Sequence, residues 1–94
     1  MNYTKRVHLL CKQIPKGKVS TYGSLAKKLK SGPRAVGQAL NKNIDPKVPC
    51  HRVVMSDGSI GGFREGVQSK IKKLAAEGVH VSKGKVLASV IIPG

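Results

Sequence analysis

A thiol and an imidazole are adjacent in the chain at Cys50 and His51, between Pro49 and the apolar pair Val53 and Val54. A cysteine sulfur attacks as the thiolate, and a free cysteine with a pKa of about 8.5 is mostly protonated at neutral pH. A neighbouring base accepts the thiol proton and lowers that pKa, so the pair has the pattern of an activated nucleophile. Pro49 fixes one backbone angle and helps to present the sulfur in a defined direction.

The charge of the chain indicates what such a nucleophile would act on. Lys and Arg number 18 against 4 Asp and Glu, which gives a formal net charge of +14. This balance favours a polyanionic partner, because each cation placed at a phosphate adds salt-dependent affinity. A solvated surface of thermophilic type is the alternative, but it would bring many Glu residues as well. With only 3 aromatic residues, a stacking platform for single strands is not expected.

The cysteine count excludes two further classes of protein. Cys11 and Cys50 are too few for a disulfide scaffold or a zinc site, so we expect no metal and no cofactor. Cys11 falls in an apolar helical register, where we interpret it as a small buried hydrophobe. No signal peptide is apparent, and the apolar stretch of residues 86–92 is too short to cross a bilayer. We therefore expect a reducing cytoplasmic setting, or the nucleus in a eukaryote, and no membrane partner.

The spacing of apolar residues predicts three helices before the Cys50 motif. Their expected ranges are residues 3–13, about 21–30 with Ser20 or Thr21 as the cap, and about 34–42. The second and third helices, joined by a short turn that contains Gly32, have the pattern of a helix-turn-helix over about residues 21–42. Together with the positive charge, this pattern favours DNA binding.

Gly37 lies in the middle of the third predicted helix, where a glycine costs helix stability. A helix pressed against a nucleic-acid backbone would explain it, and close packing against another helix would explain it equally well. Both interpretations stay open at this point.

The residues after the Cys50 motif predict one more helix and a hairpin. The helix is expected over residues 65–77, with Gly78 as its C-terminal stop and an apolar face of Val67, Ile71, Leu74 and Ala75. Residues 80–87 are expected to form a small hairpin around Lys83-Gly84. We expect a single domain over residues 1–94, of a mixed α/β class that is mainly helical, winged-helix-like and built on the helix-turn-helix core.

These motifs, in this order and spacing, resemble the C-terminal domain of the O6-alkylguanine-DNA alkyltransferases. The segments with this resemblance are Ile14-Pro15-Lys16-Gly17-Lys18-Val19, Thr21-Tyr22-Gly23, Arg34-Ala35-Val36-Gly37, Pro49-Cys50-His51-Arg52-Val53-Val54, Gly61-Gly62-Phe63-Arg64 and Leu74-Ala75-Ala76-Glu77-Gly78. Proteins of this family repair DNA by moving an alkyl group from guanine O6 to their own cysteine, once per molecule. The resemblance implies a methylated-DNA–protein-cysteine methyltransferase that acts as a monomer on duplex DNA containing O6-alkylguanine, through the minor groove.

The resemblance also implies four catalytic roles. Cys50 matches the alkyl-accepting cysteine, and His51 matches the histidine that takes its proton through a water. Glu77 matches the carboxylate that orients this histidine, because a carboxylate holding an imidazolium makes the imidazole a better base. Tyr22 matches the tyrosine whose phenol proton moves toward the guanine as the alkyl group leaves. Without the resemblance, Tyr22 would be interpreted as a core residue and Glu77 as an exposed acid at a helix end.

Further residues match positions that bind the substrate or the DNA. Arg34 matches the arginine that enters the space left by a flipped nucleotide, and flipping is needed because O6 in a stacked duplex cannot line up with a sulfur. Ala35 and Gly37 are small residues on the helix that would approach the groove. Asn43 matches an asparagine that braces the active-site turn by hydrogen bonds. The backbone carbonyls of Cys50 and Val53 match groups that read the guanine amino group. Arg64 matches a position whose backbone contacts O6.

Several positions depart from the family pattern or allow a second interpretation. Members usually have an N-terminal domain, sometimes with zinc; we expect none here and do not carry zinc over. Glu65 stands where bacterial relatives often have tryptophan, and an acid there could narrow the range of alkyl groups accepted. Lys70 matches a helix lysine of the family, but a solvated charge explains it equally well.

Two alternatives to alkyl transfer follow from the same residues. Alkyltransferase-like proteins bind O6-alkylguanine and recruit excision repair, but they replace the acceptor cysteine, whereas Cys50 is present here. The other alternative is a plain DNA-binding or chromatin protein in which Cys50 is a buried bystander. Reactivity of the thiol separates alkyl transfer from these alternatives, because only an acceptor would be consumed by O6-benzylguanine or by a methylated duplex.

Overall fold

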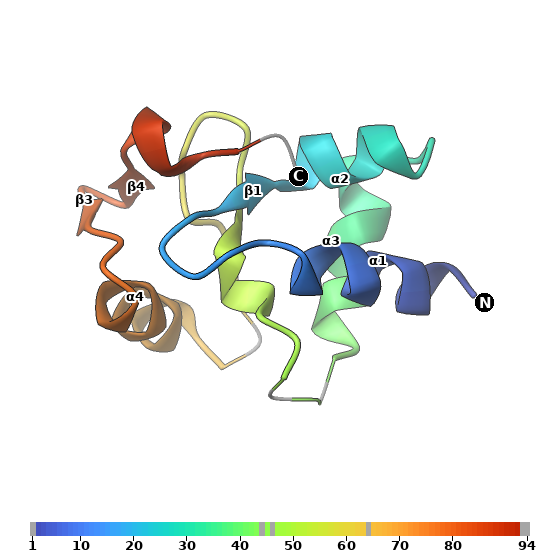
Figure 1. The fold of residues 1–94 in the computed structure, drawn as a ribbon, viewed down its shortest axis with the longest axis horizontal. Coiled ribbons are helices and arrows are strands. Elements are labelled where there is room, and N and C mark those ends of the chain that lie inside the picture. Colours follow the sequence, from blue (N-terminus) through green and yellow to red (C-terminus); the bar gives the residue numbers. More distant parts are fainter. Residues whose placement is uncertain (1, 44, 46, 64, 93–94) are drawn as a thin grey trace.

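The computed structural model describes residues 2–43, 45, 47–63 and 65–92, and over these residues it has four α-helices and four short strands (Figure 1). In chain order the elements are α1 (Tyr3–Lys12), β1 (Ser20–Thr21), α2 (Tyr22–Lys28), α3 (Pro33–Asn41), the 3-10 turn η1 (Cys50–Arg52), β2 (Val53–Val54), α4 (Val67–Ala76), β3 (Val81–Ser82), β4 (Lys85–Val86) and the 3-10 turn η2 (Ala88–Val90). The expected mixed, mainly helical class is confirmed. Across the described residues, no helix combines the length and the apolar character that a membrane crossing requires.

The first three helices begin at local signals in the sequence. The side chain of Asn2 accepts a hydrogen bond from the backbone N–H of Lys5 at 2.8 Å, which caps α1. Thr21 caps α2 in the same way, accepting from the N–H of Ser24 at 3.0 Å, so of the two predicted caps the threonine is used. Pro33 is the first residue of α3, where its missing N–H costs nothing.

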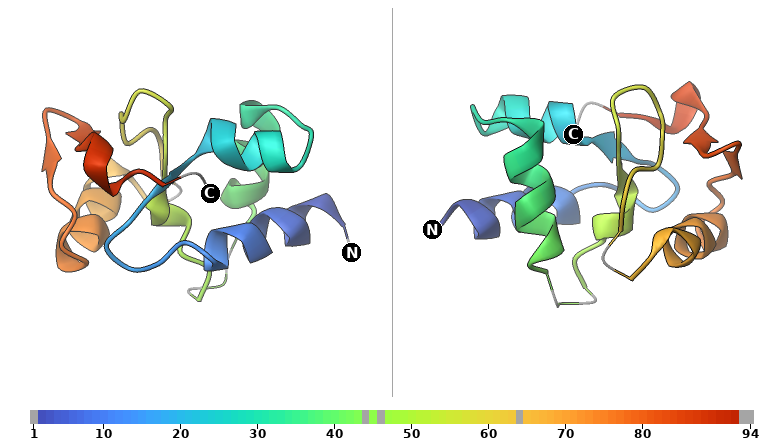
Figure 2. Two further views of the ribbon diagram at one scale, coloured as in Figure 1. Left: turned by 45° about the horizontal axis from the view of Figure 1, so that its top comes forward. Right: turned by 180° about the vertical axis from the view of Figure 1, so that it is seen from behind.

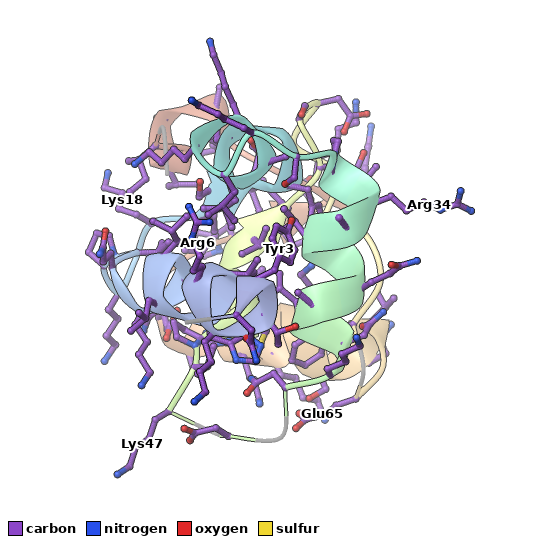
Figure 3. All side chains as sticks on the ribbon, turned by 90° about the vertical axis from the view of Figure 1, so that its right-hand side faces the viewer. Tyr3, Arg6, Lys18, Arg34, Lys47 and Glu65 are labelled. Atoms are coloured by element: carbon purple, nitrogen blue, oxygen red, sulfur yellow. The ribbon has the colours of Figure 1, made fainter. Side chains whose placement is uncertain are left out.

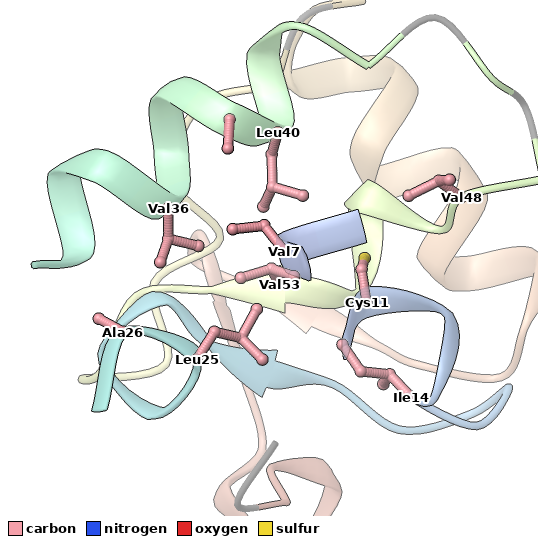
Figure 4. Close-up of a cluster of buried hydrophobic side chains, with 10 residues drawn as sticks. Val7, Cys11, Ile14, Leu25, Ala26, Val36, Leu40, Val48 and Val53 are labelled. Atoms are coloured by element: carbon pink, nitrogen blue, oxygen red, sulfur yellow. The ribbon is translucent and has the colours of Figure 1, made fainter. Parts of the chain in front are cut away.

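The helices α1, α2 and α3 pack together around a first core cluster, and α2 and α3 form the expected helix-turn-helix unit. Figure 4 shows most of this cluster, which lies under the three helices and against β2. Its buried members are Val7, Cys11, Ile14, Leu25, Ala26, Val36, Ala39, Leu40, Val48 and Val53. Most of them belong to the apolar stripes that the helical spacing predicts.

A parallel strand pair joins the helix-turn-helix to the Cys50 motif. Ser20 pairs with Val53 and Thr21 with Val54, so β1, which leads into α2, lies beside β2, which follows η1. The C-terminal residues extend this arrangement, because Val19 forms a parallel bridge with Ile91. The register places Tyr22, at the start of α2, just beyond the pair of Thr21 and Val54, on the side of the residue that follows β2. The views in Figure 2 agree that η1 lies between α3 and α4.

The C-terminal half packs around a second core cluster, defined by Val19, Val54, Ile60, Leu74, Val79 and Val86. The expected hairpin is present as β3 and β4, paired antiparallel, with Lys83 at φ +52° and Gly84 at φ +77° in its turn. Gly78, at φ +86°, follows the end of α4 as predicted, since a glycine adopts this left-handed conformation without a steric penalty.

The predicted buried face of α4 is wrong in part. Val67 is 44% exposed and Ala75 is also exposed, whereas Leu74 is buried and Lys70 is fully buried. The helix is therefore rotated relative to the expected apolar stripe. The side chain of Lys70 accounts for this rotation, because its ammonium donates to three backbone carbonyls beneath the helix. The alternative interpretation of Lys70 as a solvated charge is therefore wrong.

Candidate active site

Cys50 opens η1 and is half-buried between the first core cluster and the surface. Its sulfur accepts a hydrogen bond from Nδ2 of Asn43 at 2.8 Å. Hydrogen bonds from Cys11 and Asn43 and the charge of Lys73 outweigh burial and lower the pKa of Cys50 to about 7. This shift increases the thiolate fraction at neutral pH relative to an ordinary cysteine.

Asn43 holds both the sulfur and the chain that leads to it. Besides the contact with Cys50, Nδ2 donates to the carbonyl of Asp45 at 3.1 Å and to that of Val48 at 3.4 Å. One side chain at the end of α3 is therefore bonded at three points of the segment between α3 and η1. This geometry is what the predicted bracing role requires.

His51 and Glu77 meet at the back of the Cys50 turn. Nε2 of His51 lies 3.1 Å from Oε1 of Glu77, and both side chains are nearly buried, 13% and 12% exposed. The contact has the distance of an ion pair, but the N–H direction is off line, and Nε2 has no aligned hydrogen-bond acceptor among the described residues. Burial lowers the pKa of His51, against the opposing effect of Glu77, so the ring is neutral at pH 7 and able to accept a proton.

Arg52 is a partner of Glu77 that the sequence reasoning missed. Its Nε and Nη2 donate to the two carboxylate oxygens at 2.9 and 2.6 Å, and its Nη1 donates to the carbonyl of Ile14 at 2.8 Å. This fork holds Glu77 in one orientation, and the Arg52 guanidinium lowers the pKa of Glu77 so that it stays ionised. The only signal for this ion pair in the sequence was the scarcity of acidic residues, because it leaves few carboxylates with which Arg52 could pair.

Tyr22 is the first residue of α2, is half-buried and, like Cys50, packs against the first core cluster. Burial, together with the negative potential of Cys50, raises the pKa of Tyr22, so its phenol keeps its proton at neutral pH. The chain passes close to the ring at Gly61, where a Cβ would lie 3.5 Å from Cε2 of Tyr22. That distance is an ordinary van der Waals contact, so it is the backbone, with φ +70°, that favours glycine at this position.

Lys70 holds three backbone segments together behind the site. Its Nζ donates to the carbonyl of Val53 at 2.8 Å, to that of Gly62 at 3.3 Å and to that of Ile60. Burial lowers the pKa of Lys70 to about 8. The carbonyl of Val53, expected to read the guanine amino group, thus already has one donor and keeps one lone pair. Arg64, expected beside it, lies outside the described residues.

A cleft of about 1400 Å³ opens between α3 and the Cys50 turn. Six of the predicted site residues line it: Tyr22, Arg34, Gly37, Asn43, Cys50 and His51. Ala35 and Val53 do not line the cleft, and Glu77 lies behind His51. The volume exceeds that of typical small-ligand pockets. Within the part of the chain that is described, no three metal-ligating side chains converge.

One face of α3 is polar and borders this cleft. Arg34, Gly37, Gln38 and Asn41 follow helical spacing and all line the cleft. Figure 3 shows the side chain of Arg34 extending away from the body of the protein. A Cβ at Gly37 would meet nothing within 4 Å, so packing against another helix does not explain this glycine. The other interpretation, a helix pressed against a nucleic-acid backbone, stays a prediction.

Proteins of known sequence resemble this chain over most of its length. The family model described as the 6-O-methylguanine DNA methyltransferase DNA-binding domain matches residues 2–79. A methylated-DNA–protein-cysteine methyltransferase of Sulfolobus acidocaldarius is 44% identical over 81 residues, which are 85% of this chain and 52% of that protein. The chain spans about half the length of the methyltransferase relatives it matches.

Two solved structures share the fold. The O6-methylguanine-DNA methyltransferase of Pyrococcus kodakaraensis strain KOD1 has a TM-score of 0.77 at 46% identity, over 84% of this chain and 47% of that one. Atl1 of S. pombe, in complex with damaged DNA containing O6-carboxymethylguanine, has a TM-score of 0.79 at 30% identity, over 95% of this chain and 93% of that one.

Proposed function

The chain belongs to the family of the 6-O-methylguanine DNA methyltransferase DNA-binding domain, and from this premise we propose that it transfers an alkyl group from O6-alkylguanine in duplex DNA to Cys50. The observation that supports the proposal most directly is the state of the sulfur. Cys50 lies in the cleft with a donor from Asn43 at 2.8 Å and a pKa lowered to about 7. A damage-binding protein without transfer has no need of an activated thiolate.

The transfer is a single displacement at carbon. The Cys50 thiolate forms a bond to the alkyl carbon, the bond from that carbon to O6 breaks, and its electron pair stays with the guanine. The product is a thioether, which is not an anion and does not leave again, so each protein molecule acts once.

Two groups manage the protons of this step. The proton that leaves the Cys50 thiol passes through a water to His51, whose lowered pKa keeps it neutral beforehand. Glu77, held by Arg52, stabilises the imidazolium that results. On the other side, Tyr22 is still protonated at neutral pH and supplies its phenol proton to the departing guanine.

The DNA contacts in this proposal come from α3 and the positive surface. The polar face of α3 enters the minor groove, Arg34 fills the space of the flipped nucleotide, and the small residues Ala35 and Gly37 allow close approach. The protein binds as a monomer, and its net charge of +14 makes the affinity fall with salt. Such binding would keep it with the DNA, in the nucleoid or the nucleus.

Substitution of Gly37 by alanine should change stability and affinity in opposite directions. The free protein should gain about 0.5–1 kcal/mol in its free energy of unfolding, because the added methyl meets nothing and alanine favours the helix. Affinity for duplex DNA should fall several-fold, because the methyl takes the space of the DNA backbone. Denaturant unfolding and fluorescence anisotropy at fixed salt measure the two effects. The matched control is Gln68→Ala on the exposed face of α4, which should leave affinity unchanged. If wild type and Gly37→Ala bound duplex DNA with equal affinity, the proposal that α3 contacts the DNA would be contradicted.

Damage sensing without transfer is the second candidate, and one observation favours it. The fold matches that of Atl1 of S. pombe at a TM-score of 0.79 and 30% identity, and that protein was solved in complex with damaged DNA containing O6-carboxymethylguanine. A protein of this class would bind the flipped base in the same cleft and recruit other proteins. The thiol at Cys50 is the feature that this candidate leaves unused.

The test is intact mass after incubation with a duplex that contains one O6-methylguanine. Transfer adds the mass of one methylene equivalent per molecule and stops at one, with an unmodified duplex as the blank. Tandem mass spectrometry assigns the added group to a peptide, and Cys50 is the expected site. Tight binding without any gain in mass would replace the proposal by damage sensing. If the protein neither bound the duplex nor gained mass, both candidate functions would be rejected.

A further inference from the structure

The positive charge of the protein lies mainly outside the cleft. Among the described residues, the lining of the cleft includes three of the four acidic residues of the chain, Asp45, Asp57 and Glu65. It includes only two of the 18 Lys and Arg, which are Arg34 and Lys73. The sequence of residues 1–44, in contrast, has Lys and Arg throughout and no Asp or Glu. The proposed alkyl transfer therefore leaves most of the positive surface without a role.

Exposed cations gather on α1, on the turn that follows it and at the end of α2. Residues 5, 9 and 12 follow helical spacing and are exposed, whereas Val7 and Cys11 are buried on the other side of α1. The end of α2 adjoins this exposed side across a groove of about 300 Å³, which Arg6 and Leu9 of α1 line together with Lys28 of α2. We call this surface the basic face and define it by six exposed residues, Lys5, Arg6, Lys12, Lys16, Lys18 and Lys28.

The basic face and the polar face of α3 point in different directions. Figure 3 shows Arg6 and Lys18 on the side of the molecule where α1 lies, whereas Arg34 extends from α3 toward the opposite side. The helices α1 and α3 pack on each other. In Figure 1 α1 lies in front of α3, and in the reversed view of Figure 2 α3 lies in front of α1. A duplex bound along α3 would thus leave the basic face free for another ligand.

The basic face has no counter-ion within the part of the chain that is described. The ion pairs there belong to Glu77, with His51 and Arg52, and to Glu65, with Lys73. Like charges that gather without counter-ions repel one another, and a bound polyanion relieves this repulsion. From residue 5 to residue 12 the helix advances about 10 Å, and the phosphates of one DNA strand follow each other about every 3.4 Å along the duplex axis. Helix α1 can therefore reach several phosphates of one strand.

We propose that the basic face binds a second segment of duplex DNA while α3 and the cleft hold the first, so that one protein molecule bridges two duplexes. Contacts with phosphates and not with bases would supply the affinity, because the face presents ammonium and guanidinium groups. The three aromatic residues of the chain are all at least partly buried, which disfavours a single strand stacked on this surface. The inference goes beyond alkyl transfer and takes from the proposed function only the binding of DNA to α3.

An acidic protein segment is the rival occupant of the basic face, because it would match the charge equally well. Protein interfaces are anchored by apolar and aromatic side chains at their centre. On this surface Leu9 is the one large hydrophobic residue that is well exposed, at 44%. The other groups presented to solvent are long cationic side chains, which suit the evenly spaced charges of a phosphate backbone.

Bridging would help a protein that acts once per molecule to find a rare lesion. A molecule held on one duplex through α3 could contact a second duplex through the basic face before it releases the first. It would then pass directly between DNA segments and would not have to dissociate into solution. The contact would also draw two segments together, which is a function separate from repair.

The experiment counts the duplexes bound per protein molecule by sedimentation velocity, at low salt and with unmodified duplex in excess. A duplex of about 12 base pairs is about as long as the 35 Å long axis of the protein, so it holds about one molecule. Wild type should form a complex of one protein with two duplexes. The variant Lys5→Gln/Arg6→Gln/Lys12→Gln should keep the first duplex and bind the second at least about tenfold more weakly. The salt dependence of the second step should also weaken, because each phosphate contact adds about 0.9 to the slope.

The matched control removes the same charge from another surface. Lys72→Gln/Lys83→Gln/Lys85→Gln changes three exposed residues of α4 and the hairpin, which Figure 1 shows at the opposite end of the molecule from α1. This control should still bind two duplexes. The proposal is overturned if wild type binds only one duplex, if the α1 variant keeps the second, or if both variants lose it equally. Thermal unfolding of each variant establishes that folded protein was measured.

Two further measurements separate this inference from its rival and from alkyl transfer. If wild type bound one duplex, and a poly-glutamate peptide bound wild type but not the α1 variant, the basic face would belong to an acidic protein and the proposal would be overturned. Intact mass with the O6-methylguanine duplex should show the methyl gain in the α1 variant as in wild type. A wild type that bridges two duplexes without any mass gain would reject alkyl transfer and leave bridging in place.

Discussion

Replacing Cys50 with serine should abolish alkyl transfer, by a factor of at least about 1000, and leave the fold and duplex binding in place. A serine hydroxyl does not ionise near neutral pH, so the donors that lower the pKa of Cys50 to about 7 have no anion to stabilise. The hydroxyl can still accept the hydrogen bond from Nδ2 of Asn43, now 2.8 Å from the sulfur. The site therefore keeps its polar contact and loses its nucleophile.

Three measurements on the serine variant define this result. Intact mass with the O6-methylguanine duplex should stay unchanged, the affinity for that duplex should equal that of wild type before reaction, and the unfolding midpoint should move little. Cys11→Ser is the matched control, because it makes the same chemical change at the other cysteine and should preserve methylation. A methyl-sized gain on Cys50→Ser would place the acceptor elsewhere in the chain and contradict the proposed role of Cys50.

Replacing Lys70 with methionine should destabilise the protein by about 2–4 kcal/mol. Methionine has a similar length but no donor, so the carbonyls of Val53 and Ile60 lose their buried partner, and that of Gly62 loses a longer contact. Each unsatisfied buried acceptor costs about 1–3 kcal/mol, which outweighs the relief from burying a charge. For a domain of this size the loss corresponds to about 10 °C or more in Tm.

The matched control for Lys70→Met is Lys72→Met, in the same helix but exposed to solvent. This control should change the free energy of unfolding by less than about 0.5 kcal/mol. Urea unfolding of both variants at neutral pH is the measurement. If the two variants lose the same small amount, the three carbonyls do not depend on Lys70 for satisfaction.

Elements with local signals could be predicted from the sequence. Thr21 caps α2 because its side chain reaches the N–H of Ser24 within one turn, and Gly78 ends α4 because the chain needs a positive φ there. The hairpin around Lys83 and Gly84 has the same basis in turn geometry. In each case the deciding interaction spans a few residues, so the residue type alone is informative.

The remaining features depend on contacts between distant segments. Lys70 is an ordinary helix lysine until three carbonyls from other segments converge on its ammonium, and Arg52 finds its partner at Glu77 only when α4 packs beside η1. Cys11 has a clear helical register, but nothing in the sequence states that its sulfur faces Pro49. The site residues, and the supporting roles of Asn43 and Glu77, were predicted from the family resemblance, whereas the contacts made by Arg52, Lys70 and Cys11 could not be.

The pairing at Val19 makes the order of synthesis matter for this fold. The N–H of Val19 donates to the carbonyl of Val90 at 2.9 Å, and its carbonyl accepts from the N–H of Ile92 at 2.8 Å. A ribosome releases α1, α2 and α3 first, so the first core cluster can form on the nascent chain while this backbone still lacks its partners. The second core cluster, which includes Val86 and has Ile91 packed against it, closes only after these residues have emerged. A transcript cut just before the codon for Val86 would thus encode the helix-turn-helix and Cys50 without the finished support behind them.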